Sequence, residues 1–420
     1  MLKRGFTYGT VQMLAVLYLV IWTISPPMEI DLIYRLLALA AAAVWFVVLL
    51  LRENPVVLGK EQVAALFFML AVILITFIES ESFEDILRQI GIYMLVICFI
   101  MNYFYKDKWD ELSGILVIVF ILLTIYNFKT YSALVEDLKI ARLLVRDDES
   151  VYVYLRQGIG GYSLVYPQVC VASAALAWTI KAFRKNWLKF VVGAVWAVTF
   201  VLLISKAGYS IAIFTTVAGL SIFLFYKGRS SVVAFFVLLA FFAGSMLAIL
   251  YWHDFRNLLL EIFDGTAVAK KINDLVATGD SGAAEGSILA RIDAYKGSVD
   301  TIVDYPLIGA LWRGSGGGHS ALMDIAGKYG IFGAVMFSLM FYVVPRSYKK
   351  KNTNSFIISV SNATMVQLLF MSVMNSFTYA FSGMVLLVLP MLYEDIIKWI
   401  GEETTNESVV DGESYTSKYR

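Results

Sequence analysis

The sequence predicts an all-α polytopic membrane protein with about twelve transmembrane helices. Its 420 residues are 59% hydrophobic and only 16% charged, and the mean hydropathy is +0.73. Soluble domains contain about 45–50% apolar residues, so the excess requires a bilayer to cover it. The apolar residues also gather into runs of roughly 17–25 residues, the length of a membrane-spanning helix. In chain order these runs lie near 9–25, 32–51, 62–78, 87–105, 112–128, 162–182, 188–204, 208–226, 231–251, 320–345, 354–374 and 377–397.

The connections between these runs alternate in charge. Connections of one set are acidic or neutral, such as the one with Glu29 and Asp31. Positive residues collect on the cytoplasmic side of a membrane, so we expect both termini in the cytoplasm and the acidic connections outside. The basic set carries Lys3, Arg4, Arg52, Lys60, Lys106, Lys108, Lys181, Arg184, Lys185, Lys189, Lys227, Arg229, Arg346, Lys349, Lys350 and Lys351.

The same pattern divides the chain into four parts. Residues 1–251 hold nine predicted spans and an outer loop at about 129–161, and residues 252–319 form a large extracytoplasmic loop. Residues 320–400 hold the last three spans. Residues 401–420 are polar, and we expect a disordered cytoplasmic tail there.

The large outer loop contains two amphipathic patterns. Apolar residues recur at helical spacing over 255–263 and again over 288–303, which predicts helices that lie along the membrane interface. Tyr305-Pro306 ends the second helix, because a residue that precedes proline disfavours the helical conformation. A helical subdomain is therefore expected at the outer surface.

The end of this loop carries the residues best suited to chemistry. Arg313 precedes Gly314-Ser315-Gly316-Gly317-Gly318-His319, which leads directly into a span. Consecutive glycine N–H groups can bind an anion, an arginine can bind a phosphate through two nitrogens, and histidine is a general base near neutral pH. The alternatives are a flexible hairpin without a ligand and a structural cap.

Three other cationic residues are predicted on the outer side. Arg291 lies on the second amphipathic helix, Arg156 precedes Gln157-Gly158-Ile159-Gly160-Gly161, and Lys206 lies in a short turn between two spans. A lipid phosphate would find such cations at the membrane surface. Ordinary surface ion pairs, and a lysine side chain that extends toward water, are the simpler readings of Arg156 and Lys206.

Several motifs resemble the O-antigen and capsular polysaccharide polymerase and O-antigen ligase family. His319-Ser320, followed after nine residues by Gly330-Ile331-Phe332-Gly333, is similar to that family's His signature and Gly-x-x-Gly motif. The helix from Arg291 to Pro306-Leu307-Ile308-Gly309 looks like its arginine helix and Pro-Leu-x-Gly turn. Ser205-Lys206-Ala207-Gly208 resembles its Ser-Arg-Gly run, although a lysine lacks the fork of an arginine.

The resemblance implies a metal-independent membrane glycosyltransferase of the GT-C type in the bacterial cytoplasmic membrane. It would polymerise undecaprenyl-pyrophosphate-linked oligosaccharides at the outer face, without a cofactor, for O-antigen or capsule biosynthesis in the cell envelope. His319 and Arg291 would be catalytic, and Arg156, Lys206, Arg313, Gly316, Gly317 and Gly318 would bind substrate. Expected partners are membrane lipids, a chain-length regulator and a flippase, and the net charge of +1 gives no sign of nucleic acid.

Two other functions remain open. A ligase that transfers the glycan to a terminal acceptor would use the same residues. A flippase for the same lipid would need charges within the spans, for which Arg35, Arg88, Lys328 and Asp324 are the candidates. Asp293, Asp300 and Asp304 share part of a helix face and could together bind a divalent cation. Arg291 and Lys296 reduce the negative charge there, so we expect no metal.

Overall fold

The computed structural model describes residues 2–52, 57–79, 86, 89–106, 108–144, 149–225, 261, 288–311, 320–375 and 379–416. Within these residues, eight helices are long and apolar enough to cross a membrane, and three shorter apolar helices accompany them. The prediction of an all-α, multi-pass membrane protein is therefore confirmed. Each of these helices coincides with a predicted span, whereas the predicted span at 231–251 and the amphipathic pattern at 255–263 lie outside the described residues.

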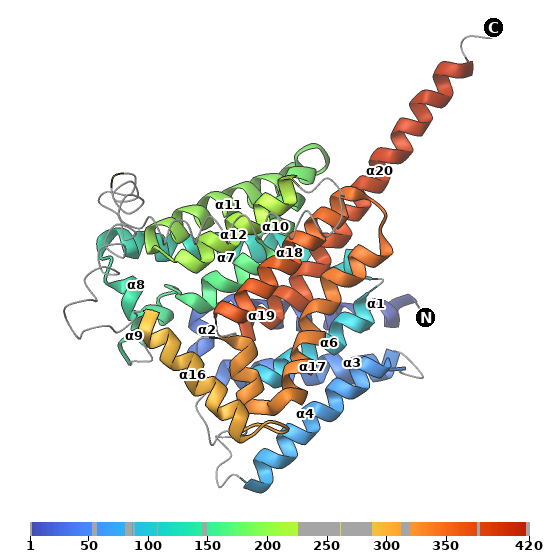
Figure 1. Ribbon diagram of the computed structural model, residues 1–420. Helices are drawn as coiled ribbons and strands as arrows, with labels where there is room; N and C mark the ends of the chain where they lie inside the picture. The colour runs from blue at the N-terminus through green and yellow to red at the C-terminus, as the bar shows by residue number, and fades with distance from the viewer. Residues whose placement is uncertain are drawn as a thin grey trace.

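The helices of the first half include one short connecting helix between the first two spans (Figure 1). Their bounds are α1 Leu2–Ile24, α2 Pro26–Ile30, α3 Leu32–Arg52, α4 Lys60–Glu79, α6 Ile90–Tyr105, η1 Trp109–Leu112, α7 Gly114–Glu136, α8 Ile140–Leu143 and α9 Glu149–Arg156.

The second half contains the predicted amphipathic helix, since α16 spans Ile288–Asp304 and ends directly before Tyr305-Pro306. The remaining bounds are α10 Tyr162–Lys185, α11 Trp187–Ala207, α12 Ser210–Phe225, α17 Ala321–Lys351, α18 Ser355–Met374, α19 Tyr379–Gly383, η2 Met384–Val388 and α20 Leu389–Thr416.

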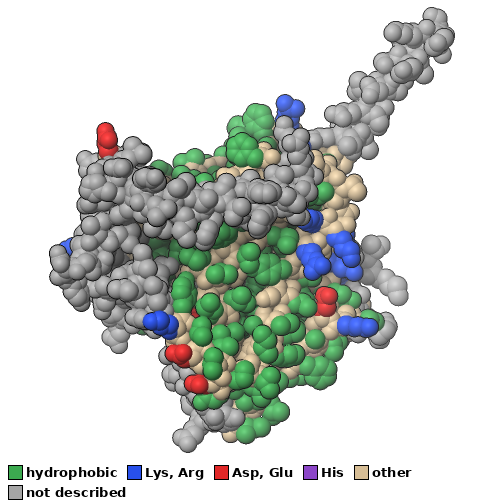
Figure 2. All heavy atoms as spheres, in the orientation of Figure 1, with side chains coloured by type: hydrophobic (Ala, Val, Ile, Leu, Met, Phe, Trp, Pro, Cys, Tyr) green, Lys and Arg blue, Asp and Glu red, His purple; other side chains and the backbone are tan. Residues whose placement is uncertain are grey.

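Burial separates central helices from peripheral ones. The most apolar stretches of α10 and of Ala380–Glu402 are 83% and 89% buried, whereas those of α3 and α4 are only 28% buried. The former helices therefore form the centre of the bundle, and the latter expose apolar side chains that require lipid around them. Figure 2 shows hydrophobic side chains over much of the described surface, with a group of basic side chains at the edge nearest the N-terminus.

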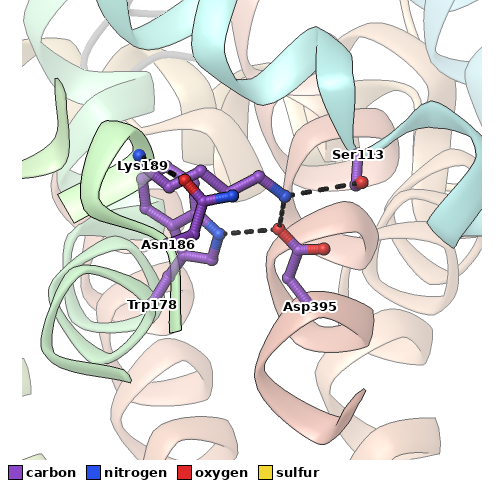
Figure 3. Close-up of polar contacts among 5 residues, drawn as sticks. All are labelled: Ser113, Trp178, Asn186, Lys189 and Asp395. Carbon is purple, nitrogen blue, oxygen red and sulfur yellow. Dashed lines mark hydrogen bonds and ion pairs between the residues drawn. The ribbon is translucent and has the colours of Figure 1, made fainter. Parts of the chain in front are cut away.

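A buried ion pair fastens α20 to the hairpin of α10 and α11 at the predicted cytoplasmic end (Figure 3). Lys189 Nζ lies 2.5 Å from Asp395 Oδ2, and the Trp178 indole N–H donates to the same oxygen at 2.9 Å. Both charged side chains are largely buried, with 13% of Lys189 and 5% of Asp395 exposed. Asn186 caps the start of α11 by accepting from the Lys189 backbone N–H, which holds Lys189 in place.

Helix α20 continues to Thr416, whereas the sequence predicts a disordered tail from residue 401. The first turns of α20 are packed within the bundle, so the helix is already nucleated where the polar tail begins. Extending an existing helix adds a hydrogen bond for each residue ordered, and the costly step is nucleation.

Helix α17 folds back on itself at Gly330, which has φ 69° and ψ −173°. Ser320 donates its hydroxyl to Ser372 O, and the Tyr342 hydroxyl bonds to Ser372 Oγ at 2.8 Å. Ser320 and Tyr342 are 22 residues apart, about 33 Å along a straight helix, so they reach one residue only because α17 is broken. The sequence predicts one continuous span at 320–345. The structure instead has two segments, 321–329 and 331–351, that meet at Gly330.

The break is covered by the turn that follows α16. The Ala310 and Leu311 N–H groups donate to Gly327 O and Lys328 O at 2.8 Å, and the Ile331 N–H donates to Pro306 O at 2.9 Å. These bonds satisfy backbone groups that a broken helix leaves without partners. We call Pro306–Leu311 together with Gly330 the tip of α17.

Gly330→Ala should destabilise the fold. A Cβ atom at this position would collide with the carbonyl group of Leu307, and the left-handed backbone alone costs a non-glycine residue about 1–3 kcal/mol. Thermal unfolding in detergent would measure this loss. The matched control is Gly297→Ala on α16, where the space around a Cβ is open and alanine favours the helix by about 1 kcal/mol. Equal melting temperatures for the two variants would contradict the packing at the tip.

Asp395→Ala should destabilise the bundle by about 3–5 kcal/mol, because it leaves the Lys189 ammonium buried without a counter-charge. The double variant Lys189→Met, Asp395→Leu should lose less, since both charges are then removed. Denaturant unfolding followed by tryptophan fluorescence would compare them. A double variant that is less stable than Asp395→Ala would contradict the claim that the unpaired Lys189 ammonium causes the loss.

Candidate functional site

Five of the eight predicted site residues lie outside the described residues. They are Arg313, Gly316, Gly317, Gly318 and His319, all within 312–319. The backbone of Arg291 is described within α16, and Arg156 and Lys206 are described in full. The structure therefore defines the frame around the glycine-rich segment.

Both ends of the segment 312–319 are fixed on α17. Leu311 is bonded to Lys328 at the tip. At the other end, Ser320 is the N-cap of α17, its hydroxyl accepts from the Met323 N–H, and the Ala321 N–H donates to Asn375 O at 2.6 Å. Lys328 is eight residues from Ser320, about 12 Å along the helix. The two described residues that flank this segment, Leu311 and Ser320, therefore lie at opposite ends of the first segment of α17.

The start of α17 lies deeper in the bundle than the tip. Ser320 and Tyr342 both bond to Ser372, and Tyr342 lies 12 residues from Gly330, about 18 Å along the second segment. The helix N-terminus that follows His319 is therefore set back from the tip. The N-terminus of a broken helix carries a partial positive charge and attracts anionic groups of a substrate.

Asp324 joins α16 to this N-terminus. The Ser298 hydroxyl of α16 donates to Asp324 Oδ1 at 2.8 Å, and the Ser320 N–H donates to Asp324 Oδ2 at 3.2 Å. Position 291 lies seven residues before Ser298, which is two helical turns, so both positions are on one face of α16. Lys296, two residues before Ser298, is exposed on another face. The structure thus places Arg291 and Lys296 on different sides of α16.

Three tyrosines lie next to the start of α17 and form what we call the outer tyrosine cluster. The rings of Tyr162 and Tyr166 stack with centroids 4.5 Å apart, and Tyr209 packs edge-on against Tyr162 at 4.8 Å. The Tyr166 hydroxyl interacts with the side chain of Asn375, whose carbonyl group binds the Ala321 N–H. The residue after His319 and the turn that contains Tyr209 therefore adjoin the same cluster.

Lys206 lies at the end of α11, directly before that turn. It is partly exposed in the last turn of α11, and Gly208 ends the helix in the left-handed conformation at φ 61°. A lysine here is also favoured by the negative end of the helix dipole, so its position alone does not require a ligand. Lys206 precedes Tyr209 by only three residues in the sequence, so its backbone lies at the same end of the bundle as Ser320.

Arg156 is the last residue of α9, which packs against α2. Its Nη2 lies 3.7 Å from Asp31 Oδ1, and both side chains are well exposed. Such a surface pair contributes about 0–1 kcal/mol, so the guanidinium remains available to a stronger anion. Arg156 is six residues before Tyr162, and the intervening Gly158 is held in the left-handed conformation at φ 80° against Tyr126.

Glu29 lies beside this region on α2, and no sequence motif marks it as a functional residue. The Ser163 hydroxyl donates to Glu29 Oε2 at 2.8 Å, and Arg35 donates from Nε and Nη2 to the Glu29 carbonyl oxygen. Burial raises the pKa of the Glu29 carboxyl group, whereas the Ser163 hydrogen bond and the Arg35 charge act in the opposite direction. No local sequence signal would identify it, because the contact joins residues 134 positions apart.

Comparison with known proteins adds no assignment: no protein-family model and no curated protein matches this chain. The function must therefore be argued from the arrangement of these residues. That arrangement combines a helix N-terminus, cationic residues from three separate parts of the chain, and a cluster of aromatic rings at one end of the bundle.

Asp324→Ala should loosen α16 from α17. It removes the acceptor of the Ser298 hydroxyl, and one buried unsatisfied group costs about 1–3 kcal/mol. Hydrogen exchange measured by mass spectrometry should become faster in 288–304 and remain unchanged in α7. The control is Asp300→Ala, which removes an exposed carboxylate of α16. Unchanged exchange in 288–304 would show that Asp324 does not hold α16.

Proposed function

We propose that this protein is a membrane glycosyltransferase that polymerises oligosaccharide units carried on undecaprenyl pyrophosphate at the outer face of the bacterial cytoplasmic membrane. The observation that carries the proposal is the break in α17. It sets the N-terminus that follows His319 back among the helix ends, with α16 beside it. A lipid-linked pyrophosphate arriving through the membrane would meet cations and backbone N–H groups there.

In the proposed reaction, an acceptor hydroxyl attacks the anomeric carbon of the donor sugar. The bond from this carbon to the pyrophosphate oxygen breaks as the new glycosidic bond forms, and the configuration at carbon inverts. His319 accepts the proton of the attacking hydroxyl. Arg291 and Arg313 balance the charge that develops on the departing pyrophosphate, with Arg156 and Lys206 at the edge of the site. No cofactor is needed, because the donor is already activated.

The helix faces of α16 support the role of Arg291. Position 291 shares the face of Ser298, which contacts the first turn of α17, whereas Lys296 points elsewhere and is exposed. An arginine on this face can act at the leaving group beside the N-terminus of α17. A cation that only kept the protein surface soluble would not need to lie on the face of α16 that contacts α17.

A ligase remains the second candidate, since transfer to a terminal acceptor would use the same site. Two of the charged residues that a flippase would need within the spans favour it less than they favour an enzyme. Arg35 is engaged by the Glu29 carbonyl oxygen, and Asp324 by Ser298 and Ser320. Both lie near the starts of their helices, where these contacts stabilise local structure.

Arg291→Ala should reduce polymerisation by about 10²–10³-fold, as expected when one charge-stabilising donor is removed, whereas Lys296→Ala should keep wild-type activity. His319→Ala should lose about 10²–10⁴-fold, the usual contribution of a general base. The assay is reconstitution in liposomes with undecaprenyl-pyrophosphate repeat units and a chelator, with products separated on a gel.

The reconstitution separates the candidate functions. A ladder that disappears with Arg291→Ala establishes a polymerase. Transfer that occurs only after a foreign acceptor is added indicates a ligase. Movement of the lipid between leaflets, without any glycosidic product, would refute the glycosyltransferase and identify a transporter.

A further inference from the structure

A groove of about 280 Å³ lies between α3, α4 and α6. Its walls are apolar throughout. Ala42, Ala43 and Phe46 come from α3, Leu66 and Met69 from α4, and Ile97 from α6. The two alanines leave the space that a larger side chain would fill.

We propose that this groove binds the polyprenyl chain of the lipid-linked donor. The inference rests on the proposed function for the identity of the lipid, and on the following geometry for the binding of a hydrocarbon chain.

The depth of the groove excludes a polar ligand. Ala43 lies near the middle of the 21-residue helix α3, and Ile97 lies near the middle of the 16-residue helix α6. The middle of a membrane-spanning helix is at the centre of the hydrocarbon layer, about 15 Å from either surface. Only hydrocarbon is present at that depth, and an apolar groove there gains by holding a chain that packs against its walls.

The groove opens sideways to the lipid. α3 packs against α1, whereas α4 packs against α6 and α17, so α3 and α4 stand as separate walls. Phe46, which lines the groove, is 38% exposed, and its neighbour Val47 on α3 and Leu70, next to Met69 on α4, are exposed as well. A chain can therefore enter from the bilayer without leaving the hydrocarbon layer.

The wall beneath the groove is rigid. The Trp45 ring is 2% exposed, and its N–H donates to the Tyr105 hydroxyl at 3.3 Å. The polar atom of this side chain is thereby satisfied on the side of α6, and the groove is left with an apolar indole surface. A preformed wall of this kind costs little to order when a chain binds.

Helix α4 connects the groove to the candidate site. Phe68 lies between the groove residues Leu66 and Met69, and its ring packs at 5.8 Å against both Tyr329 and Phe332. These two aromatic residues flank the break at Gly330. One helix thus contacts the tip of α17 on one side and forms the groove on another, which suits a lipid whose headgroup reacts beside α17. A donor with one hydrocarbon chain needs only one such groove, whereas a phospholipid brings two chains.

The test compares Ala43→Phe with Ala40→Phe. Ala43 lines the groove, whereas Ala40 is exposed on the same helix outside it, so both variants add the same ring to a lipid-facing helix. Binding of undecaprenyl phosphate to the purified protein would be measured by native mass spectrometry. We expect Ala43→Phe to weaken binding at least about tenfold, equivalent to about 1.4 kcal/mol, and Ala40→Phe to bind like the wild type.

Three outcomes would overturn the proposal. Equal binding of undecaprenyl phosphate to all three proteins would place the chain elsewhere. Displacement of undecaprenyl phosphate by equimolar phosphatidylglycerol would identify a phospholipid site. Absence of binding to the wild-type protein would leave the groove without a polyprenyl ligand. If Ala43→Phe fails to fold, as judged by its melting temperature, Ala43→Leu replaces it with the same expected direction.

The binding measurement does not depend on catalysis, so the two proposals can fail separately. Groove-dependent binding with no product in the reconstitution would retain the lipid site and refute the polymerase. In an active protein, Ala43→Phe should raise KM for the undecaprenyl donor and leave kcat unchanged. Polymerisation with equal KM in both variants would refute the groove and retain the enzyme.

Discussion

The backbone pairing at the tip of α17 is the constraint on which the candidate site depends. A helix broken at Gly330 exposes N–H and carbonyl groups, and these cannot remain unpaired near the hydrocarbon layer. The turn from Pro306 to Leu311 supplies the missing partners through hydrogen bonds to Gly327, Lys328 and Ile331. The same pairing holds Leu311, the last described residue before the segment 312–319, so the fold of α17 and the position of Leu311 have one cause.

The division between central and peripheral helices would give the two ends of the proposed lipid substrate different surroundings. α10 and the stretch Ala380–Glu402, which includes the start of α20, are almost fully enclosed and are joined to α11 by the Lys189–Asp395 ion pair. This rigid centre carries the outer tyrosine cluster and the Asn375 carbonyl that receives the start of α17. α3 and α4 face the lipid and leave an apolar groove between them. A pyrophosphate headgroup and a hydrocarbon chain would each find a suitable environment within one bundle.

The individual cations at the predicted outer end of the bundle have ordinary structural roles. They suggest a binding site only in combination. Lys206 complements a helix dipole, and Arg156 forms an exposed pair with Asp31. Arg291 differs because its helical register places it on the face of α16 that contacts α17. Glu29 shows that a polar contact at this end can arise from helices remote in sequence, since α2 meets the start of α10 only after the bundle is assembled.

The sequence by itself determined the helical class, the positions of the spans, the end of α16 before Tyr305-Pro306 and the helix that carries Arg291. Each of these depends on local hydropathy, periodicity or proline sterics, which act within one segment. Only the tertiary structure decided that α17 folds back at Gly330, that Asp324 fastens α16, and that Ser320, Tyr166 and the turn with Lys206 adjoin. These features depend on contacts between segments far apart in the chain. The sequence of 320–345 is apolar enough for a straight span, and it breaks because the turn at 306–311 offers its backbone hydrogen bonds another partner.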